Sequence, residues 1–332
     1  MSTYHYTTDK NNAIREDDIR DILAERLGKE NVPKKLKVIT DTSDYFRVNY
    51  DDVVVLGGRP YLIRHDQKEG RFGIDEQPKF WVKKAIDLID GSFKIIKLTF
   101  LERFTSKVGG IIFECFRSPQ KEARILDLVR GDERFMQGFS VKDSAGNVVR
   151  ILDFIYGKTF ADYILTLGKN HEDYFYNFFP QVFSEYIELV RAIGYIHAHG
   201  EKHGDIRRDH ILRDNTGLNI WIDFDFNYLH RENMFGYDLF GLGNILIYIV
   251  GRGDVTIQEL QSRGDPAFYS LSKEDMNIIF NNRVANLKKV FPYIPESLNI
   301  TLLHFSSGAP VFYDNTNQLL SDIEEAKSVI VS

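Results

Sequence analysis

The pattern of apolar and polar positions changes about halfway along the chain. From about residue 36 to residue 154, short runs of β-branched and aromatic residues alternate with glycine-containing turns, which is typical of strands joined by hairpins. The predicted strands cover residues 37–40, 53–56, 59–64, 80–88 and 93–100. One helix interrupts them, because Ser118 and Pro119 supply an N-cap and a first-turn proline ahead of apolar residues at helical spacing.

Helical spacing dominates from about residue 178 onward. Apolar residues recur there every three or four positions and predict an amphipathic helix that Gly200 ends. These apolar residues are Val182, Tyr186, Leu189, Ile193 and Ile196. A second, strongly apolar helix is predicted over about residues 237–250, and a lone amphipathic helix over residues 17–27 precedes the first strands.

A strand-rich segment joined to a helical one, without a low-complexity linker, is typical of an α+β fold with two lobes and a cleft between them. The 332 residues are 43% hydrophobic and 27% charged, which leaves enough apolar material for a core and excludes an extensively disordered chain. We therefore expect an α+β protein with a β-rich N-terminal lobe and a helical C-terminal lobe.

Net charge and cysteine content restrict the partners and the cellular compartment that we expect for the protein. The net charge of -6 offers no general attraction to nucleic acid or to an anionic membrane. The longest apolar stretch, about residues 239–250, is shorter than the roughly 20 residues that span a bilayer. A single cysteine, Cys115, forms no intramolecular disulfide, as expected in a reducing compartment. We expect a cytoplasmic protein with no nucleic-acid partner and no membrane partner.

The densest group of polar residues lies around a predicted strand pair, residues 210–214 and 218–224. Asp205 precedes this pair and Asp223 ends it. A hairpin brings the outer ends of its two strands together, so Asp205, His210 and Asp223 are expected to share one site. The structural alternative is that these aspartates only cap turns, which is a common role for aspartate.

Residues 203–212 and 222–225 resemble the catalytic and metal-binding loops of the protein-kinase-like superfamily, which read His-Arg/Gly-Asp, then Asn five residues on, then Asp-Phe-Gly or Asp-Phe-Asp. Further segments resemble the superfamily in the same order along the chain: the lysine strand at 91–98, the glutamate helix at 121–126, the hinge at 152–157, the central helix at 237–246 and the closing helix at 312–325. The resemblance is to an atypical bacterial-type Ser/Thr protein kinase, with features of aminoglycoside- and choline-type phosphotransferases. It implies an extension at 1–58, an N-lobe at 59–152 and a C-lobe at 153–332.

The resemblance also implies roles in ATP-dependent phosphoryl transfer. Lys97 would contact the α- and β-phosphates, and Glu122 would orient Lys97 through an ion pair. Asp205 would accept the hydroxyl proton, and Arg207 would contact the transferred phosphate. Asp223 would hold Mg²⁺, with Mn²⁺ as the alternative ion. The structural alternatives are a strand-end lysine at 97 and an ordinary helix glutamate at 122.

Two candidate metal ligands depart from the pattern of the superfamily. His210 stands where the superfamily has its metal-binding Asn, and imidazole suits Mn²⁺ or Zn²⁺ better than Mg²⁺. The alternative is a structural histidine bonded to a neighbouring carbonyl. Asp225 replaces the usual Gly and would supply the missing oxygen ligand.

The nucleotide-binding elements are sparse in this chain. Gly70, Phe72 and Gly73 resemble the later half of a kinase glycine loop, whose backbone amides approach phosphate, although an ordinary hairpin turn has the same composition. The hinge would offer adenine the carbonyl of Asp153 and the N–H of Ile155.

The segment between Asp223 and Asp238 spans only fifteen positions and has no Ala-Pro-Glu motif, so a long activation segment is absent from the sequence. The resulting prediction is an ATP-dependent phosphotransferase that acts on a hydroxyl, most simply an atypical Ser/Thr protein kinase. Two alternatives stay open: a kinase for small hydroxyl-bearing molecules, which the short segment favours, and a nucleotide-binding pseudokinase, which His210 favours.

Overall fold

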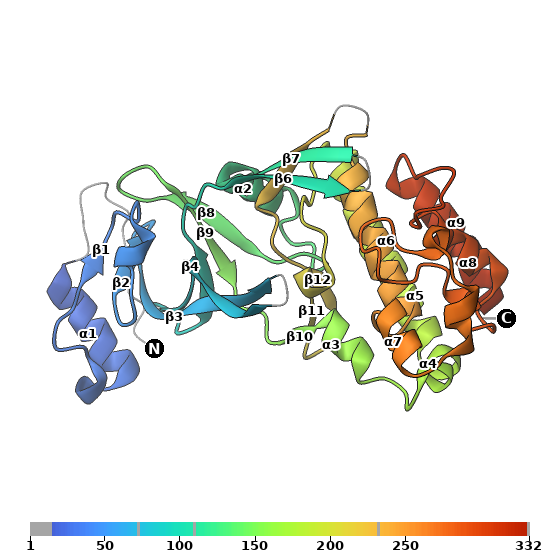
Figure 1. The fold of residues 1–332 in the computed structure, drawn as a ribbon. Coiled ribbons are helices and arrows are strands. Elements are labelled where there is room, and N and C mark those ends of the chain that lie inside the picture. The colour runs from blue at the N-terminus through green and yellow to red at the C-terminus, as the bar shows by residue number, and fades with distance from the viewer. Residues whose placement is uncertain (1–14, 72–73, 109–110, 231–232, 331–332) are drawn as a thin grey trace. The chain divides into compact units, whose positions relative to one another are not determined.

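The computed structural model describes residues 15–71, 74–108, 111–230 and 233–330 (Figure 1). The chain divides into two compact units, each described by itself below. The first contains the chain up to Phe100 together with Gln137–Phe154, and the second contains Leu101–Met136 together with Ile155–Ser332. The α+β class is confirmed, with a curled sheet in the N-terminal part and helices in the C-terminal part. The lobe boundaries implied by the resemblance stay predictions.

The first unit is a seven-stranded sheet with the order β1-β2-β3-β4-β5-β9-β8. Every neighbouring pair is antiparallel except β1 and β2. The strands are β1 (Val38–Ile39), β2 (Val53–Leu56), β3 (Arg59–Arg71), β4 (Ile74–Asp87), β5 (Phe93–Lys97), β8 (Gly138–Lys142) and β9 (Val148–Asp153). The turn from β2 to β3 is made by Gly57 and Gly58, both with positive φ (57° and 77°), as a two-residue hairpin requires.

The two faces of this sheet have separate cores, as strand alternation dictates. On one face, helix α1 (Glu16–Leu27) packs Ile19 and Leu23 against Val53, Leu62 and Leu88. The opposite face buries the neighbouring strand positions in a second cluster that includes Val54, Ile63, Ala85, Ile96 and Ile151. The amphipathic helix predicted over residues 17–27 therefore covers one face of the sheet.

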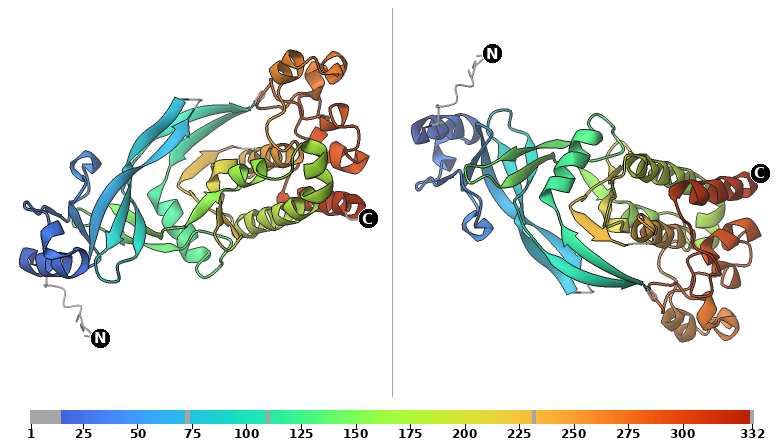
Figure 2. Two further views of the ribbon diagram at one scale, coloured as in Figure 1. Left: turned by 90° about the horizontal axis from the view of Figure 1, so that it is seen from below. Right: turned by 90° about the horizontal axis from the view of Figure 1, so that it is seen from above.

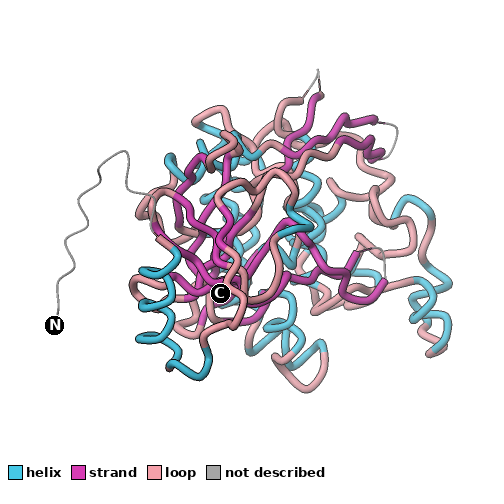
Figure 3. The backbone as a smooth tube through the Cα atoms, turned by 90° about the vertical axis from the view of Figure 1, so that its left-hand side faces the viewer, coloured by secondary structure: helices cyan, strands magenta, loops and turns pink. Residues whose placement is uncertain are grey.

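Strands β3 and β4 continue well past the predicted ends of their strands, as a two-stranded ribbon that extends to the pair Arg71 and Ile74. Polar residues such as Gln67, Lys68 and Gln77 occupy the added pairs. A polar ribbon has no buried face, so it leaves no alternating hydrophobic pattern in the sequence. The strands of the chain can be followed as magenta tubes in Figure 3.

The second unit combines helices with two small sheets, in the orders β6-β7-β13 and β10-β11-β12. Its helices are α2 (Pro119–Leu128), α3 (Phe160–Leu165), α4 (His171–Asn177), α5 (Phe179–Ala198), α6 (Gly236–Val250), α7 (Ile257–Ser262), α8 (Glu296–Leu303) and α9 (Thr316–Ile330). Its strands are β6 (Arg103–Val108), β7 (Ile111–Arg117), β10 (Gly157–Thr159), β11 (Ile211–Asp214), β12 (Asn219–Trp221) and β13 (Phe226–Leu229). Short 3₁₀ helices occupy residues 29–31 and 45–47 of the first unit and residues 208–210, 266–270, 273–275 and 287–289 of the second.

Helices α5 and α6 pack against each other in the second unit (Figures 1 and 2). Helix α6 is buried on nearly every side, which explains its almost continuous apolar sequence. The hydroxyl of Tyr186 on α5 donates a hydrogen bond of 2.9 Å to the carbonyl of Leu242 on α6. Both helices match their predicted spans. Within the described residues, we find no helix with the length and apolarity needed to cross a membrane.

A half-buried histidine at the start of α4 is expected to make the stability of the protein sensitive to acid. The ring of His171 stacks on Phe291 with centroids 3.4 Å apart. Its Nε2 lies 2.8 Å from the carbonyl of Val250, which only accepts, so Nε2 donates and Nδ1 accepts from the hydroxyl of Tyr293 at 2.7 Å. Burial lowers the pKa of His171 to about 4.

We expect the free energy of unfolding to fall as the pH is lowered from 6.5 to about 4. In this window the unfolded chain binds a proton at residue 171 that the folded chain excludes, and stability is then lost on acidification. The contribution is ~1–2 kcal/mol, allowing for partial exposure of the ring. Urea titrations of His171→Gln should show a shallower dependence on pH, whereas His199→Gln, at an exposed position, should match the wild type. Equal slopes for all three proteins would contradict this assignment.

Candidate functional site

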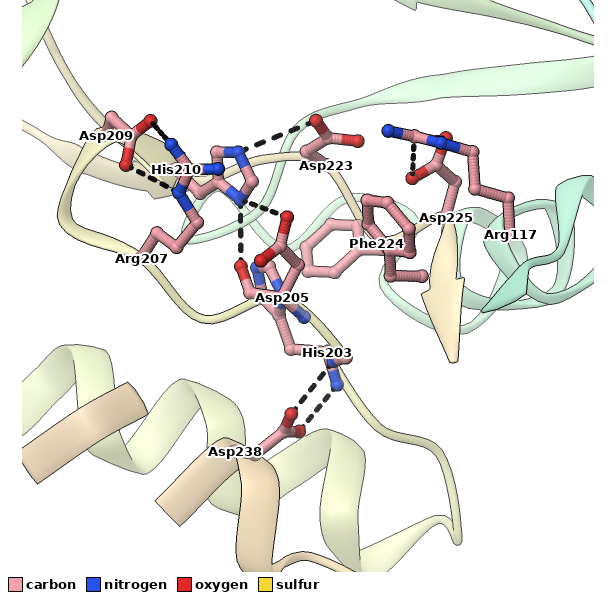
Figure 4. A network of polar contacts seen from close by, with 12 residues as sticks. Arg117, His203, Asp205, Arg207, Asp209, His210, Asp223, Phe224, Asp225 and Asp238 are labelled. Atoms are coloured by element: carbon pink, nitrogen blue, oxygen red, sulfur yellow. Dashed lines mark hydrogen bonds and ion pairs between the residues drawn. The ribbon is translucent and has the colours of Figure 1, made fainter. Parts of the chain in front are cut away.

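A hairpin in the second unit positions the central residues of the site. Strands β11 and β12 pair Ile211 with Trp221, and the N–H of Ile222 donates 3.0 Å to the carbonyl of His210. The segments before β11 and after β12 therefore lie side by side. These segments carry Asp205 and Asp223, so the sequence-based expectation that the two aspartates and His210 meet agrees with the structure (Figure 4).

The imidazole of His210 lies between the two carboxylates. Its Nδ1 is 3.7 Å from Oδ2 of Asp205, and its Nε2 is 3.6 Å from Oδ2 of Asp223 (Figure 4). The closest contact of Nδ1 is the carbonyl oxygen of Asp205, at 2.8 Å. A carbonyl only accepts, so Nδ1 carries a proton and, in the neutral ring, Nε2 presents its lone pair toward Asp223.

The exposure of these three side chains suits a site that a solute can reach. The side chain of His210 is 4% exposed, whereas those of Asp205 and Asp223 are 17% and 12% exposed. Asp223 also has a φ of 67°, a left-handed conformation that non-glycine residues adopt rarely and that recurs at functional sites. Carboxylate oxygens are the ligands that Mg²⁺ prefers, so Asp223 and Asp205 suit that ion better than the imidazole does. Within the described ranges, no group of three or more His, Cys, Asp or Glu side chains is arranged to hold a metal ion.

A buried aspartate on α6, Asp238, holds the loop that carries Asp205 through hydrogen bonds. The carboxylate of Asp238 accepts from the backbone N–H of His203 at 2.8 Å, from that of Gly204 at 2.9 Å, and from Nε2 of His197 at 2.9 Å. Burial favours the neutral acid, but the hydrogen bond from His197 and nearby positive charge hold the pKa of Asp238 below its usual range. The central helix thus fixes the start of the loop.

The histidine that opens the loop is held in its neutral form. His203 is fully buried and lies edge-on to Trp221 and Phe224, with ring centroids 5.1 and 4.8 Å away. Burial lowers the pKa of His203 to about 3, and its Nδ1 accepts from the N–H of Asp205 at 3.3 Å. This ring orients the backbone at Asp205 and carries no charge at neutral pH.

Asp225 is held by an arginine that the sequence analysis did not single out. Nη1 of Arg117, at the end of β7, donates to both carboxylate oxygens of Asp225, at 2.8 and 2.7 Å (Figure 4). Nε of Arg117 donates to Glu102 at 3.0 Å, and the guanidinium lies over the ring of Phe226, 3.9 Å from its centroid. Both members of the pair are almost fully buried, and the two aspartates at 225 and 223 raise the pKa of Arg117 despite its burial. This geometry gives Asp225 a structural ion pair.

Arg207 is partly buried beside the site and pairs with Asp209. Its Nη2 lies 2.5 Å from one carboxylate oxygen of Asp209, and its Nε lies 3.1 Å from the other (Figure 4). Arg207 is the N-cap residue of the 3₁₀ helix over residues 208–210, which contains Asp209. A guanidinium here presents several donors in a fixed plane, which suits phosphate oxygens.

The remaining predicted residues are divided between the two units. In the first unit, Lys97 is buried at the end of β5, and Asp153 ends β9 with its carboxylate 2.6 Å from Nζ of Lys94. Gly70 belongs to β3, while Phe72 and Gly73 lie outside the described residues. In the second unit, Glu122 is fully buried on α2, and Ile155 opens the segment that leads to β10.

Comparisons with known proteins give limited support. No family model matches this chain. The chain is 25% identical over 91 residues to the 2-5A-dependent ribonuclease of Mus musculus, a match that covers 27% of this chain and 12% of the ribonuclease. The match is short and weak, and the α+β architecture is compatible with a kinase-like fold.

Proposed function

We propose that this protein is an ATP-dependent phosphotransferase that moves the γ-phosphoryl group to a hydroxyl, as an atypical Ser/Thr protein kinase. The observation that carries the proposal is the convergence of Asp205 and Asp223 on His210, from loops that follow one another in the order expected for a kinase-like chain. The resemblance to the kinase-like superfamily supports it.

The chemistry assigns a separate role to each carboxylate. Asp205 accepts the proton of the acceptor hydroxyl while the oxygen of that hydroxyl bonds to the γ-phosphorus. The bond between the γ-phosphorus and the bridging oxygen breaks, and ADP leaves. Asp223 holds the divalent ion, which neutralises charge on the phosphates when it is bound. Arg207 supplies a guanidinium for the transferred phosphate.

The nucleotide contacts in this proposal are those that the resemblance implies. Lys97 binds the α- and β-phosphates and Glu122 orients it, as the resemblance implies. Both side chains are buried, and a buried charge is costly unless it is partnered. The backbone at Asp153 and Ile155 receives the adenine.

A kinase for small hydroxyl-bearing molecules is the second candidate. The short segment after Asp225 forms strand β13, which pairs with β7 from Phe226 to Leu229. Because this segment is paired as a strand, it offers a peptide substrate little surface to bind. Transfer of labelled phosphate to hydroxylated metabolites, but not to generic protein substrates, would favour this candidate over a protein kinase.

We expect Asp223→Asn to abolish Mg²⁺-dependent binding of ATP and, with it, turnover. The amide has no negative charge to hold the ion, so affinity for the nucleotide in the presence of Mg²⁺ should fall to its level in EDTA. Isothermal titration calorimetry and ADP release measure the two effects. Asp254→Asn is the matched control, because Asp254 pairs with Arg208 and Arg283 and has no assigned role in transfer.

The alternative of a pseudokinase makes a different prediction. It requires ATP hydrolysis and phosphoryl transfer by the wild type to equal the background of Asp223→Asn, with or without Mg²⁺. That outcome would refute the phosphotransferase proposal.

A further inference from the structure

Helix α2 inserts a lysine beneath both loops of the candidate site. The ammonium of Lys121 donates to the carbonyls of His203 at 2.7 Å, Phe224 at 2.9 Å and Phe226 at 2.5 Å. The side chain is 1% exposed. An ammonium has three N–H donors, so these three carbonyls match its full capacity. A single buried charge thus joins the loop before Asp205 to the segment after Asp223.

Burying the charge of Lys121 at this position would be unfavourable without its three carbonyl acceptors. Lys121 lies in the first turn of α2, where the helix dipole disfavours a positive charge, and it is removed from water. Burial lowers the pKa of Lys121 to about 8. Four nearby carboxylates act in the opposite direction and raise it: Asp238, Asp225, Glu201 and Glu122. At neutral pH the ammonium is still the main form, and all three of its hydrogen bonds are available.

A second contact ties the same end of α2 to the same segment. The N-cap of α2 is Ser118, whose N–H donates a hydrogen bond of 2.6 Å to the carbonyl of Asp225. The hydroxyl of Ser118 accepts a hydrogen bond of 3.2 Å from the N–H of Lys121. The start of the helix is therefore fixed to residues 224–226 by backbone as well as by side chain.

Gly204 makes room for this arrangement. Its φ is 90°, and a Cβ at this position would lie 1.9 Å from the carbonyl oxygen of Phe226 and 3.2 Å from Nζ of Lys121. No side chain fits there, since backbone and ammonium fill the space.

We propose that Lys121 is a positioning residue, which locks α2 to the loops of Asp205 and Asp223 and keeps the two carboxylates in their working arrangement without any covalent modification of the chain. This proposal rests on the phosphotransferase function proposed above.

The test compares Lys121→Met with a variant that destabilises the same helix. Ile125→Ala removes a fully buried side chain one turn further along α2 and leaves the three carbonyls paired. Lys121→Met should lower kcat by ~10–100-fold with KM for ATP changed by less than about threefold, because displaced groups slow the chemical step. Ile125→Ala should keep kcat within about threefold of the wild type at a temperature where both variants are folded.

Hydrogen–deuterium exchange of the protein without nucleotide separates this proposal from the proposed function. Lys121→Met should speed exchange of the amides at 203–206 and 224–226 by at least tenfold relative to Ile125→Ala, whether or not the wild type turns over ATP. If Lys121→Met does not fold, Lys121→Gln, which keeps two donors, is expected to give the same changes at smaller size. Unchanged exchange at both segments, or an equal loss of kcat in the Lys121 and Ile125 variants, would overturn the proposal.

Discussion

Replacing Asp205 with asparagine is expected to lower the rate of phosphoryl transfer by ~10²–10⁴-fold and to leave the affinity for Mg²⁺·ATP unchanged. An amide cannot accept the hydroxyl proton, whereas the backbone carbonyl that binds Nδ1 of His210 is retained. The substitution therefore removes the base and preserves the local hydrogen bonds. Single-turnover transfer of labelled phosphate and calorimetric titration with a nonhydrolysable analogue measure the rate and the affinity separately.

Two outcomes would contradict the role assigned to Asp205. A rate within about threefold of the wild type would show that this carboxylate is not the base. A loss of nucleotide affinity as large as that of Asp223→Asn would make Asp205 a metal ligand instead. Asp254→Asn again serves as the control, with wild-type rate and affinity expected.

The second large effect is on stability. Arg117→Met is expected to lower the free energy of unfolding by ~3–5 kcal/mol, because it leaves the carboxylate of Asp225 buried without its ion-pair partner. Urea denaturation of the wild type and the variant measures the difference. The expected loss is much larger than that from breaking an exposed ion pair such as Arg130 with Asp127, which contributes ~0–1 kcal/mol.

A double variant distinguishes lost pairing from lost packing. Arg117→Met combined with Asp225→Leu removes both charges and should recover most of the stability, since well-packed apolar residues often replace a buried ion pair without loss. A double variant no more stable than Arg117→Met alone would show that the arginine acts through its packing on Phe226.

Elements with one buried face were predictable from the sequence. Helices α1 and α5 appear where periodic apolar residues placed them, because burial of one face imposes the period of the helix. Helix α6, which is buried on nearly every side, appears where an almost continuous apolar run placed it. The ends of β3 and β4 and the whole of β6 were not predicted. These segments are polar and form two-stranded ribbons or edges, so no buried face imposes alternation on them.

The candidate site was predictable in part for a related reason. A hairpin signal between Asp205 and Asp223 was enough to expect that both lie near His210. The partners of Arg117 and Lys121 were not predictable, because a carbonyl acceptor leaves no trace in the sequence and a distant carboxylate leaves very little. A lysine at position 121, four residues before Ile125 on the buried face of a helix, was the one available signal.

The roles of Lys97, Glu122 and the glycine-containing turn remain predictions from the resemblance. Lys97 and Gly70 belong to the first unit, whereas Glu122 belongs to the same unit as Asp205, His210 and Asp223. Their burial and positions on β5 and α2 fit the proposed roles.

The most direct test of the phosphotransferase proposal is a crystal structure of the protein with a nonhydrolysable ATP analogue and Mn²⁺, recorded with anomalous scattering. We predict a manganese peak at coordination distance from the carboxylate of Asp223 and from the phosphate oxygens, with Nζ of Lys97 in contact with the α- or β-phosphate. A nucleotide bound elsewhere, or Lys97 and Asp223 on surfaces that no common cavity joins, would contradict it.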